Sequence, residues 1–254
     1  MKNFQLKAKI LAQTKIKDNY WHCEFSAPQI AKNALPGQFI NIRVSANFDP
    51  LLRRPISLHG VSAAKVKIVY EVVGKATEIL VRKKKGEFLD IIGPLGNGFD
   101  LGMQKAEGRR QILVAGGMGV APLMFLAEKL KVPSLVLIGA KTKKDLLCVQ
   151  EFKKLGCSVK ISTDDGSLGF KGRVTELLRN NLTKSCALYA CGLKPMLKVI
   201  SDIANEYNIP AQVSLEEHMS CGIGACLGCV VKTKEGLKRV CQEGPVFKAQ
   251  DLIW

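Results

Sequence analysis

Four cysteines lie within twenty-one residues near the end of the chain, and they constrain what it can fold into more than any other feature. In EEHMSCGIGACLGCVVKTKEGLKRVCQEGPVF the spacing is C-x4-C-x2-C, with eleven residues before the fourth cysteine. Three close thiolates in a glycine-rich loop can wrap an inorganic core, and this triplet has the plant-type spacing of a [2Fe–2S] centre. Zinc ribbons usually carry two C-x2-C pairs, whereas this segment has one. The spacing therefore favours an iron–sulfur cluster over zinc, on Cys221, Cys226, Cys229 and Cys241.

The total of nine cysteines is odd, and the clustering of four suits metal ligation in a reducing compartment better than a disulfide framework. The N-terminal sequence MKNFQLKAKI lacks the apolar stretch of a signal peptide, and no apolar run approaches the roughly 18–20 residues of a membrane span. We therefore expect a cytoplasmic protein with no membrane partner. The remaining cysteines are scattered and are expected to be mostly small buried residues: Cys23, Cys148, Cys157, Cys186 and Cys191.

The net charge of +16 raises the question of nucleic acid, since phosphate binding depends on clustered Lys and Arg. Residues 1–101 carry 16 basic and 8 acidic side chains, residues 102–212 carry 17 and 9, and residues 213–254 carry 5 and 5. The excess is spread over two thirds of the chain, and no interleaved aromatic residues offer stacking surfaces for bases. The sequence therefore predicts no nucleic-acid partner, although dispersed positive charge can attract anionic dinucleotides.

The first hundred residues have the pattern of a small antiparallel barrel. Short runs of strand character are broken by Pro, Gly or Asn, at residues 4–16, 20–27, 37–44 and 66–73. Residues 76–83 predict one short helix, opened by Thr77. We expect residues 1–101 to form this barrel.

From residue 111 the pattern changes to strands alternating with helices. Strands are expected at residues 111–117, 134–140, 158–162 and 187–191, and helices at 121–130, 145–155, 173–180 and 195–207. Such alternation predicts a doubly wound parallel sheet that binds ligands at the carboxyl ends of its strands. We expect this nucleotide domain to span residues 102–212. Residues 213–254 have little regular periodicity and form the expected cluster lobe.

Two segments have the character of nucleotide sites. A one-electron cluster that works with a two-electron donor needs an intermediary, and flavin is the usual one. In RRPIS, Arg54 can pair with a pyrophosphate and Ser57 can hydrogen-bond a flavin ring nitrogen. Further on, Gly74 and Thr77 precede a short helix whose N-terminus would hold phosphate, and GPLGNGF at 93–99 supplies a turn cluster that ends the barrel.

The second nucleotide segment is LVAGGMGVAPLMFLAEKL, a strand, a turn and a helix. Gly116, Gly117 and Gly119 let the backbone approach a diphosphate at the helix N-terminus. Pro122 stands where the usual dinucleotide fingerprint favours Gly or Ala, but it suits a first helical turn. Cys191 follows the strand ALYA at the carboxyl edge, where a nicotinamide could sit; a buried thiol is an equally good interpretation.

With these residues assembled, the chain resembles the ferredoxin–NADP reductase superfamily, and more closely the electron-transfer subunits of dihydroorotate dehydrogenase B. The resemblance runs in order through RRPIS, VVGKAT, GPLGNGF, AGGMGVAPL, DDGSLGFKG, SLEEHMSCGIGACLGC and CQEGPVF. It implies an FAD-binding barrel, an NAD-binding domain and a C-terminal [2Fe–2S] lobe. By resemblance, the FAD contacts are Arg54, Pro55, Ile56, Ser57, Val69, Tyr70, Glu71, Ala76 and Thr77. Ala76 replaces a usual Gly, and Ile56 replaces an aromatic residue of the wider superfamily.

The resemblance implies an electron relay. A separate catalytic subunit oxidises dihydroorotate with FMN, and electrons cross the cluster to FAD and then to NAD+. In the family, two catalytic and two electron-transfer subunits form a heterotetramer. This chemistry needs no catalytic acid, and His22, His59 and His218 are interpreted as structural, although His218 lies close enough to the cluster loop to support a ligand.

Two alternative functions and one question of nucleotide preference stay open at this point. The chain could serve a hydrogenase, a sulfite reductase or a bifurcating ferredoxin:NADP oxidoreductase, although the first ligand is often acidic in bifurcating relatives and here it is Cys221. A preference for NAD would follow if Asp164 and Asp165 repel a 2′-phosphate. A basic zinc module that binds nucleic acid would explain the charge and the cysteines, but it leaves the flavin-like and nucleotide-like segments without a role.

Overall fold

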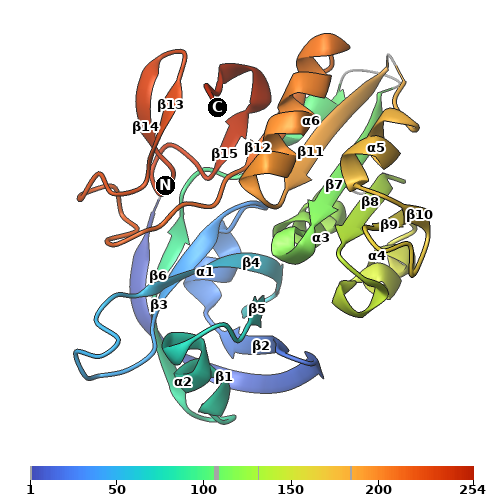
Figure 1. Cartoon of the computed structure of the whole chain (residues 1–254). Coiled ribbons are helices and arrows are strands. Elements are labelled where there is room, and N and C mark those ends of the chain that lie inside the picture. Colours follow the sequence, from blue (N-terminus) through green and yellow to red (C-terminus); the bar gives the residue numbers. More distant parts are fainter. Residues whose placement is uncertain (1, 106–108, 131, 184) are drawn as a thin grey trace.

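The computed structural model describes residues 2–105, 109–130, 132–183 and 185–254. Figure 1 shows an N-terminal barrel, a sheet flanked by helices, and a C-terminal lobe that lies beside the barrel. The expected fold class is confirmed: an antiparallel barrel, a parallel-sheet nucleotide domain and a small cluster lobe. Among the helices of the described residues, none has the length and apolar character needed to cross a bilayer.

Six antiparallel strands close the barrel in the order β1-β2-β5-β4-β3-β6. Their bounds are β1 Phe4–Lys17, β2 Tyr20–Ser26, β3 Phe39–Arg43, β4 Arg54–Ser62, β5 Lys65–Glu71 and β6 Phe88–Leu95. Alternate residues face the interior because side chains in a strand point to opposite faces. On β5, for example, Val66, Ile68 and Tyr70 are buried in the barrel core.

Two barrel strands, β4 and β6, do not appear among the strands expected from the sequence. β4 opens with Arg-Pro and contains Gly60, and β6 contains Gly93-Pro94, so each carries residues that ordinarily interrupt strands. The helix α1 (Pro28–Asn33) was also not expected, and α2 (Lys75–Arg82) lies one residue from its expected position. Gly74, rather than Thr77, is the residue that precedes α2.

The nucleotide domain has seven strands in the order β10-β9-β8-β7-β11-β12-β15. All are parallel except the edge strand β15. The bounds are β7 Arg110–Gly116, β8 Leu135–Ala140, β9 Ser158–Thr163, β10 Phe170–Lys171, β11 Cys186–Cys191, β12 Ala211–Ser214 and β15 Val246–Lys248. The central strands β7, β8 and β11 are almost continuously buried, as expected of a sheet covered on both faces.

The helices of this domain are α3 (Val120–Leu130), α4 (Val149–Lys154), α5 (Val174–Arg179) and α6 (Lys194–Glu206). The helix expected at 145–155 is shorter than predicted. A turn of 3-10 helix, η3, covers Lys143–Asp145, and α4 starts only after Cys148, which adopts a left-handed conformation with φ of 59°. Two further 3-10 turns are η1 (Leu101–Lys105) and η2 (Gly117–Gly119).

The C-terminal segment is more regular than its sequence pattern indicates. It contains a hairpin, β13 (Val230–Thr233) and β14 (Gly236–Arg239), and it ends with β15 and the 3-10 turn η4 (Ala249–Asp251). Strand β15 pairs with β12 at the edge of the nucleotide sheet. The division expected at residue 212 therefore falls within β12, and the cluster lobe is anchored to the nucleotide domain.

Candidate cluster, flavin and nucleotide sites

The four cysteines of the motif converge on one region of the C-terminal lobe. Three lie in the cluster loop, defined here as residues 220–229, and Cys241 follows the hairpin that this loop leads into. Cys229 and Cys241 are buried, Cys221 is half-buried and Cys226 is exposed. The hairpin β13–β14 thus returns the chain so that the fourth cysteine reaches the first three.

Contacts among the cysteines divide them into two pairs. The amide of Cys226 points at Cys221 Sγ, with 3.4 Å between nitrogen and sulfur, and the amide of Cys241 points at Cys229 Sγ, also at 3.4 Å. The Gly224 amide donates to Cys241 Sγ at 3.1 Å. Amides directed at sulfur stabilise thiolate, which is the form that binds metal.

The same amides influence the acidity of Cys221. Partial burial acts to raise the pKa of its thiol, but the amides of Ile223 and Cys226 outweigh it and lower the pKa to about 6. Burial and the adjacent Cys229 thiol raise the pKa of Cys241 to about 12. A cationic group between the pairs would compensate the cost of holding the buried thiolates.

The donor set fits an iron–sulfur cluster. Four cysteines gather in this lobe, and backbone amides are directed at the sulfur atoms of three of them, which suits the thiolate ligands that such a cluster requires. Gly222 and Gly224 adopt left-handed φ angles of 70° and 84°, which let the loop curl and turn its amides inward.

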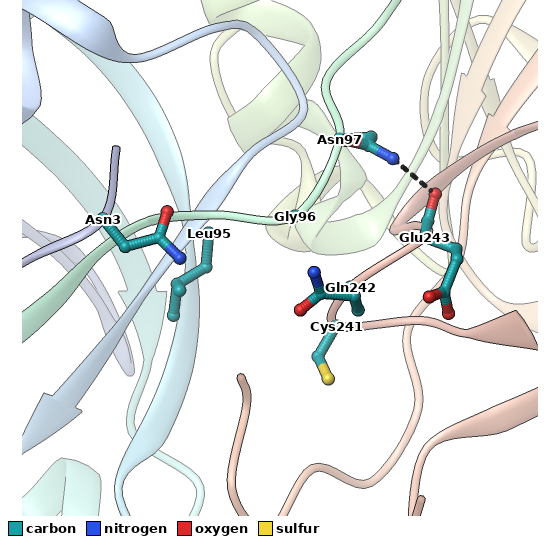
Figure 2. Close-up of a pocket in the computed structure, with 7 residues that line it drawn as sticks. All are labelled: Asn3, Leu95, Gly96, Asn97, Cys241, Gln242 and Glu243. Atoms are coloured by element: carbon teal, nitrogen blue, oxygen red, sulfur yellow. Dashed lines mark hydrogen bonds between the residues drawn. The ribbon is translucent and has the colours of Figure 1, made fainter. Parts of the chain in front are cut away.

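Side chains of the barrel hold the cluster loop in place. Asn41, buried on β3, donates from Nδ2 to the Cys221 carbonyl at 3.1 Å. Asn97, after β6, donates from Nδ2 to the Glu243 carbonyl at 2.9 Å. Figure 2 shows this second contact beside a cavity of about 360 Å³ that is lined by both parts: Asn3, Leu95, Gly96, Asn97, Cys241, Gln242 and Glu243. The cavity belongs to the junction between barrel and cluster.

Asn41 also connects the cluster to the expected flavin strand. It stands opposite Pro55 in the pairing of β3 with β4, while Phe39 stands opposite Ser57. Sequence reasoning missed Asn41, although a signal exists: it is a polar residue inside the apolar strand FINIR. Its burial requires a hydrogen-bond partner, and the cluster loop provides one.

The expected FAD residues on β4 and β5 divide between two faces. Ile56 and Tyr70 pack into the barrel core, so their backbones rather than their side chains are available to a ligand. Pro55 and Ser57 alternate with Ile56 and are half-buried, as is Glu71, whereas Val69 is buried outside the core cluster.

The two arginines of RRPIS have different partners. Arg53 pairs with Asp90 at 2.9 Å, which fixes it to β6. The Arg54 guanidinium donates to the Leu52 carbonyl at 2.7 Å, and it forms no ion pair with an acidic side chain among the described residues. Its charge is therefore available to an anion such as a pyrophosphate.

The turn before α2 is closed by a side chain of the helix itself and leaves open space at the helix N-terminus. The amides of Val73 and Gly74 both donate to Thr77 Oγ1, at 3.0 and 3.2 Å, so Thr77 organises the turn from inside the helix. A Cβ on Gly74 would meet no atom within 4 Å, which leaves open space at the helix N-terminus. The Ala76 side chain is buried under the turn. The helix N-terminus favours an anion at this point.

The glycines after β7 serve different purposes. A Cβ on Gly119 would lie 2.0 Å from the Cys191 carbonyl oxygen, and one on Gly116 would lie 2.6 Å from Met196 Sδ. Gly119 therefore lets the turn pack against the end of β11, and Gly116 lets the end of β7 pack against α6. Gly117 has a φ of 53° and open space around its Cβ position, so it faces a volume that a dinucleotide could occupy.

The remaining expected residues lie at the carboxyl edge of the sheet or beside the cluster. Burial raises the pKa of Cys191 to about 12, so it is a neutral thiol next to the glycine turn. Asp164 and Asp165 follow β9 and are exposed. Hydrogen bonds from Ser167 lower the pKa of Asp165 and keep it ionised. His218 lies three residues before Cys221 and is exposed.

Comparisons with known proteins agree with this geometry. Two family models match: the iron-sulfur cluster binding domain of dihydroorotate dehydrogenase B over residues 216–253, and the oxidoreductase NAD-binding domain over residues 113–202. The dihydroorotate dehydrogenase B (NAD(+)) electron transfer subunit of Desulforamulus reducens is 45% identical over 258 residues, covering 97% of each chain. That of Caldanaerobacter subterraneus subsp. tengcongensis is 38% identical over 255 residues, covering 99% of each chain.

Solved structures give the same fold. A structure of the NADH-dependent reduced ferredoxin-NADP oxidoreductase, described for flavin-based electron bifurcation, matches with a TM-score of 0.84 at 32% identity, covering 97% of this chain and 90% of that one. The ferredoxin reductase of carbazole 1,9a-dioxygenase matches with a TM-score of 0.68 at 18% identity, covering 83% and 68%. The chain belongs to the family of electron transfer subunits of NAD(+)-dependent dihydroorotate dehydrogenase B.

Proposed function

We propose that the chain passes electrons from the FMN of a dihydroorotate-oxidising catalytic subunit to NAD+, in pyrimidine (UMP) biosynthesis. The observation that carries the proposal is the position of Asn41, which contacts the Cys221 carbonyl and stands opposite Pro55 on the flavin strand. The cluster loop is thereby held between the barrel and an exposed surface. When bound, the [2Fe–2S] cluster carries single electrons, and FAD exchanges them with NAD+ as a two-electron hydride.

The cysteines hold the cluster as two pairs, Cys221 with Cys226 and Cys229 with Cys241. Backbone amides directed at their sulfur atoms stabilise the thiolate charge, which helps to set the reduction potential. The exposed position of Cys226 places one pair near the surface, where an electron can arrive from a partner.

For FAD, Arg54 neutralises the pyrophosphate, and the turn closed by Thr77 presents its helix N-terminus to the phosphates. Ser57 offers a hydroxyl to the flavin ring, and Pro55, Ile56, Val69, Tyr70, Glu71 and Ala76 shape the site largely through backbone and packing. For NAD+, the backbone of the Gly116–Gly119 turn binds the diphosphate, and Cys191 lies where the nicotinamide would bind. Asp165 favours NAD+ over NADP+ because its carboxylate repels a 2′-phosphate.

We assign these tasks to three parts of the chain: the FAD barrel to residues 1–101, the NAD domain to 102–212 and the cluster lobe to 213–254. The partner would be an FMN-containing catalytic subunit, two copies of each subunit forming a heterotetramer. A cytoplasmic location fits four cysteines kept as thiolates in a reducing compartment. Orotate chemistry belongs to the partner, since the chain's own nucleotide sites account for flavin and nicotinamide only.

A docking face for the catalytic subunit lies around the cluster loop. Ile223, Leu227 and Leu237 are 48%, 62% and 66% exposed, and the hairpin and loop enclose a groove of about 410 Å³. Residues 213–254 have 5 basic and 5 acidic side chains, so the contact would depend on apolar burial more than on charge. Strong salt sensitivity of the subunit complex would count against this face.

A hydrogenase, a sulfite reductase or a bifurcating oxidoreductase is the alternative partner, and the 32% identity to a bifurcating enzyme favours the last of these over the other two. Anaerobic purification of the chain with its natural partner separates the possibilities. We expect flavin and iron–sulfur absorption together with an FMN protein that oxidises dihydroorotate. Recovery of a hydrogenase or sulfite reductase, or a colourless zinc protein, would contradict the proposal.

A further inference from the structure

His59 occupies a bulge on the strand that carries the expected flavin contacts. Leu58 pairs with Ile68 and Gly60 pairs with Lys67, so β4 has one extra residue, His59, between successive partners on β5. Bulges re-aim a side chain and recur beside active sites. The bulge lies two residues beyond Ser57, where the strand leaves the proposed flavin site.

The His59 ring reaches across to the nucleotide domain. Its Nδ1 lies 3.2 Å from the carbonyl oxygen of Ala121, in the first turn of α3. A carbonyl can only accept, so Nδ1 must carry the hydrogen. Ala121 follows Gly119 by two residues, and this hydrogen bond therefore joins the flavin strand directly to the end of the dinucleotide turn.

The imidazole is held neutral in this position. Burial lowers the pKa of His59 to about 4, the neighbouring His22 ring and Lys67 act in the same direction, and the Ala121 carbonyl opposes them. An acidic side chain, Glu128 of α3, also lies beside this part of β4, and burial raises the pKa of its carboxyl group. The neutral ring therefore carries its single hydrogen on Nδ1 and donates it to the Ala121 carbonyl.

The surrounding contacts keep the two domains close at this point. A Cβ on Gly60 would lie 3.2 Å from Glu128 Oε2, so β4 and α3 approach each other closely at this point. Phe125 of α3 is fully buried among the core residues of the barrel. Apolar packing brings the surfaces together but is not directional, whereas the His59 hydrogen bond fixes how α3 is oriented on β4.

We propose that His59 is a positioning residue for hydride exchange, which locks the flavin strand β4 to the first turn of α3 so that flavin and nicotinamide meet in register. The inference rests on the proposed FAD and NAD+ sites. Hydride transfer requires the reacting atoms to approach to about 3–3.5 Å, and a misplacement of about 1 Å can cost a hundredfold in rate. A hydrogen bond between the two binding domains controls that distance without touching either cofactor.

Three substitutions test the role. In His59→Asn the amide nitrogen replaces Nδ1 and retains the donor, in His59→Gln the donor lies one methylene further out, and in His59→Leu it is absent. We expect wild-type FAD content in all three. Stopped-flow reduction of the flavin by NADH should be within about threefold of wild type for Asn and about ten- to a hundredfold slower for Leu. The long-wavelength charge-transfer band of stacked flavin and nicotinamide should weaken in the same order.

His22→Asn is the matched control, since the His22 ring packs edge-on against the His59 ring, with 6.3 Å between the ring centroids. Flavin reduction by NADH should proceed at the wild-type rate in this variant. If His59→Leu does not fold, the comparison of Asn with Gln decides: equal rates for the two overturn the proposal. Equal rates for Leu and wild type do so as well.

A second readout does not depend on turnover. Long-range ¹H–¹⁵N spectra of the purified protein should show His59 as the Nδ1–H tautomer. The Nε2–H tautomer would overturn the proposal even in active protein. If NADH fails to reduce the wild-type flavin while the Nδ1–H tautomer is present, the proposed function fails and the domain lock stands.

Discussion

The side-chain amide of Asn41 donates a hydrogen bond to the backbone carbonyl of Cys221, with 3.1 Å between Nδ2 and the oxygen. Asn41 is 1% exposed, and a Cβ on the adjacent Gly222 would lie 2.4 Å from its Nδ2. One buried amide thus fixes the first cluster ligand to a barrel strand. This contact ties the cluster loop to β3, the strand that pairs with β4.

Replacing Asn41 with Ala should loosen the cluster loop. The half-buried Cys221 carbonyl loses its donor, and loss of such a hydrogen bond costs about 0.5–1.5 kcal/mol. Chelator-induced iron loss should accelerate at least severalfold, while FAD content stays at the wild-type level. Asn33→Ala, which removes an exposed asparagine of α1, is the control and should release iron at the normal rate. Unchanged iron release from Asn41→Ala would show that the contact is incidental.

Replacing Cys226 with Ser should abolish the iron–sulfur absorption and reduce bound iron, because one of the paired thiolates is missing. NADH oxidation with an artificial two-electron acceptor should continue within about twofold, since the barrel and the nucleotide turn are intact. Cys157→Ser changes a cysteine outside the cluster and should keep both signals. Full iron content in Cys226→Ser would remove this residue from the ligand set.

Two identical substitutions in one turn should have different consequences. In Gly119→Ala the new Cβ meets the Cys191 carbonyl at 2.0 Å, so the backbone must move and the fold loses about 1–3 kcal/mol or more. In Gly117→Ala the space is open and the positive φ costs about 1–2 kcal/mol, but the methyl group enters the proposed nucleotide volume.

Thermal unfolding and steady-state kinetics separate the two effects. Gly119→Ala should show the larger loss of stability with or without nucleotide. Gly117→Ala should mainly raise the KM for NADH. An unaltered KM in Gly117→Ala would place the dinucleotide elsewhere.

The fold could be predicted where the spacing of apolar residues in the sequence shows directly which residues are buried. The alternation of strands and helices after residue 111 gave the parallel sheet because its central strands are apolar throughout. β4 and β6 were missed because Pro55, Gly60 and Gly93 mark breaks locally, while pairing with distant strands overrides them. The same limit hid the pairing of β15 with β12, which joins residues far apart in sequence.

For the candidate site, the cysteine spacing was sufficient to predict the cluster ligands because these residues lie close together in the sequence. Contacts between different domains join residues that are far apart in the sequence, so they could not be predicted from a local pattern. Asn41 appeared only as a polar residue in an apolar strand, and His59 was interpreted as structural because the sequence does not show that a bulge turns it toward Ala121.

The depressed pKa of His59 makes stability depend on pH in a defined direction. Its pKa is about 4 in the folded protein and near 6.5 when exposed, so the unfolded chain binds more protons between these values. The part of the free energy of unfolding that depends on a neutral His59 is fully present above about pH 6.5. It is lost progressively as the pH falls toward 4, and the loss is about 1 kcal/mol at pH 5.5.

Urea unfolding at pH 7.5 and 5.5 measures this difference for wild type and for His59→Asn. The wild-type protein should lose about 1 kcal/mol more than the variant on acidification. An equal loss in both proteins would mean that His59 titrates normally in the folded state.

The most direct test of the electron path is anaerobic reconstitution of the chain with the FMN catalytic subunit, followed by the reduction of NAD+ by dihydroorotate. We predict NADH formation that requires both subunits and is lost in Cys226→Ser, although the catalytic subunit still oxidises dihydroorotate with an artificial acceptor. NADH formation at the wild-type rate by the Cys226→Ser complex would contradict the account, because electrons would then reach NAD+ without the cluster.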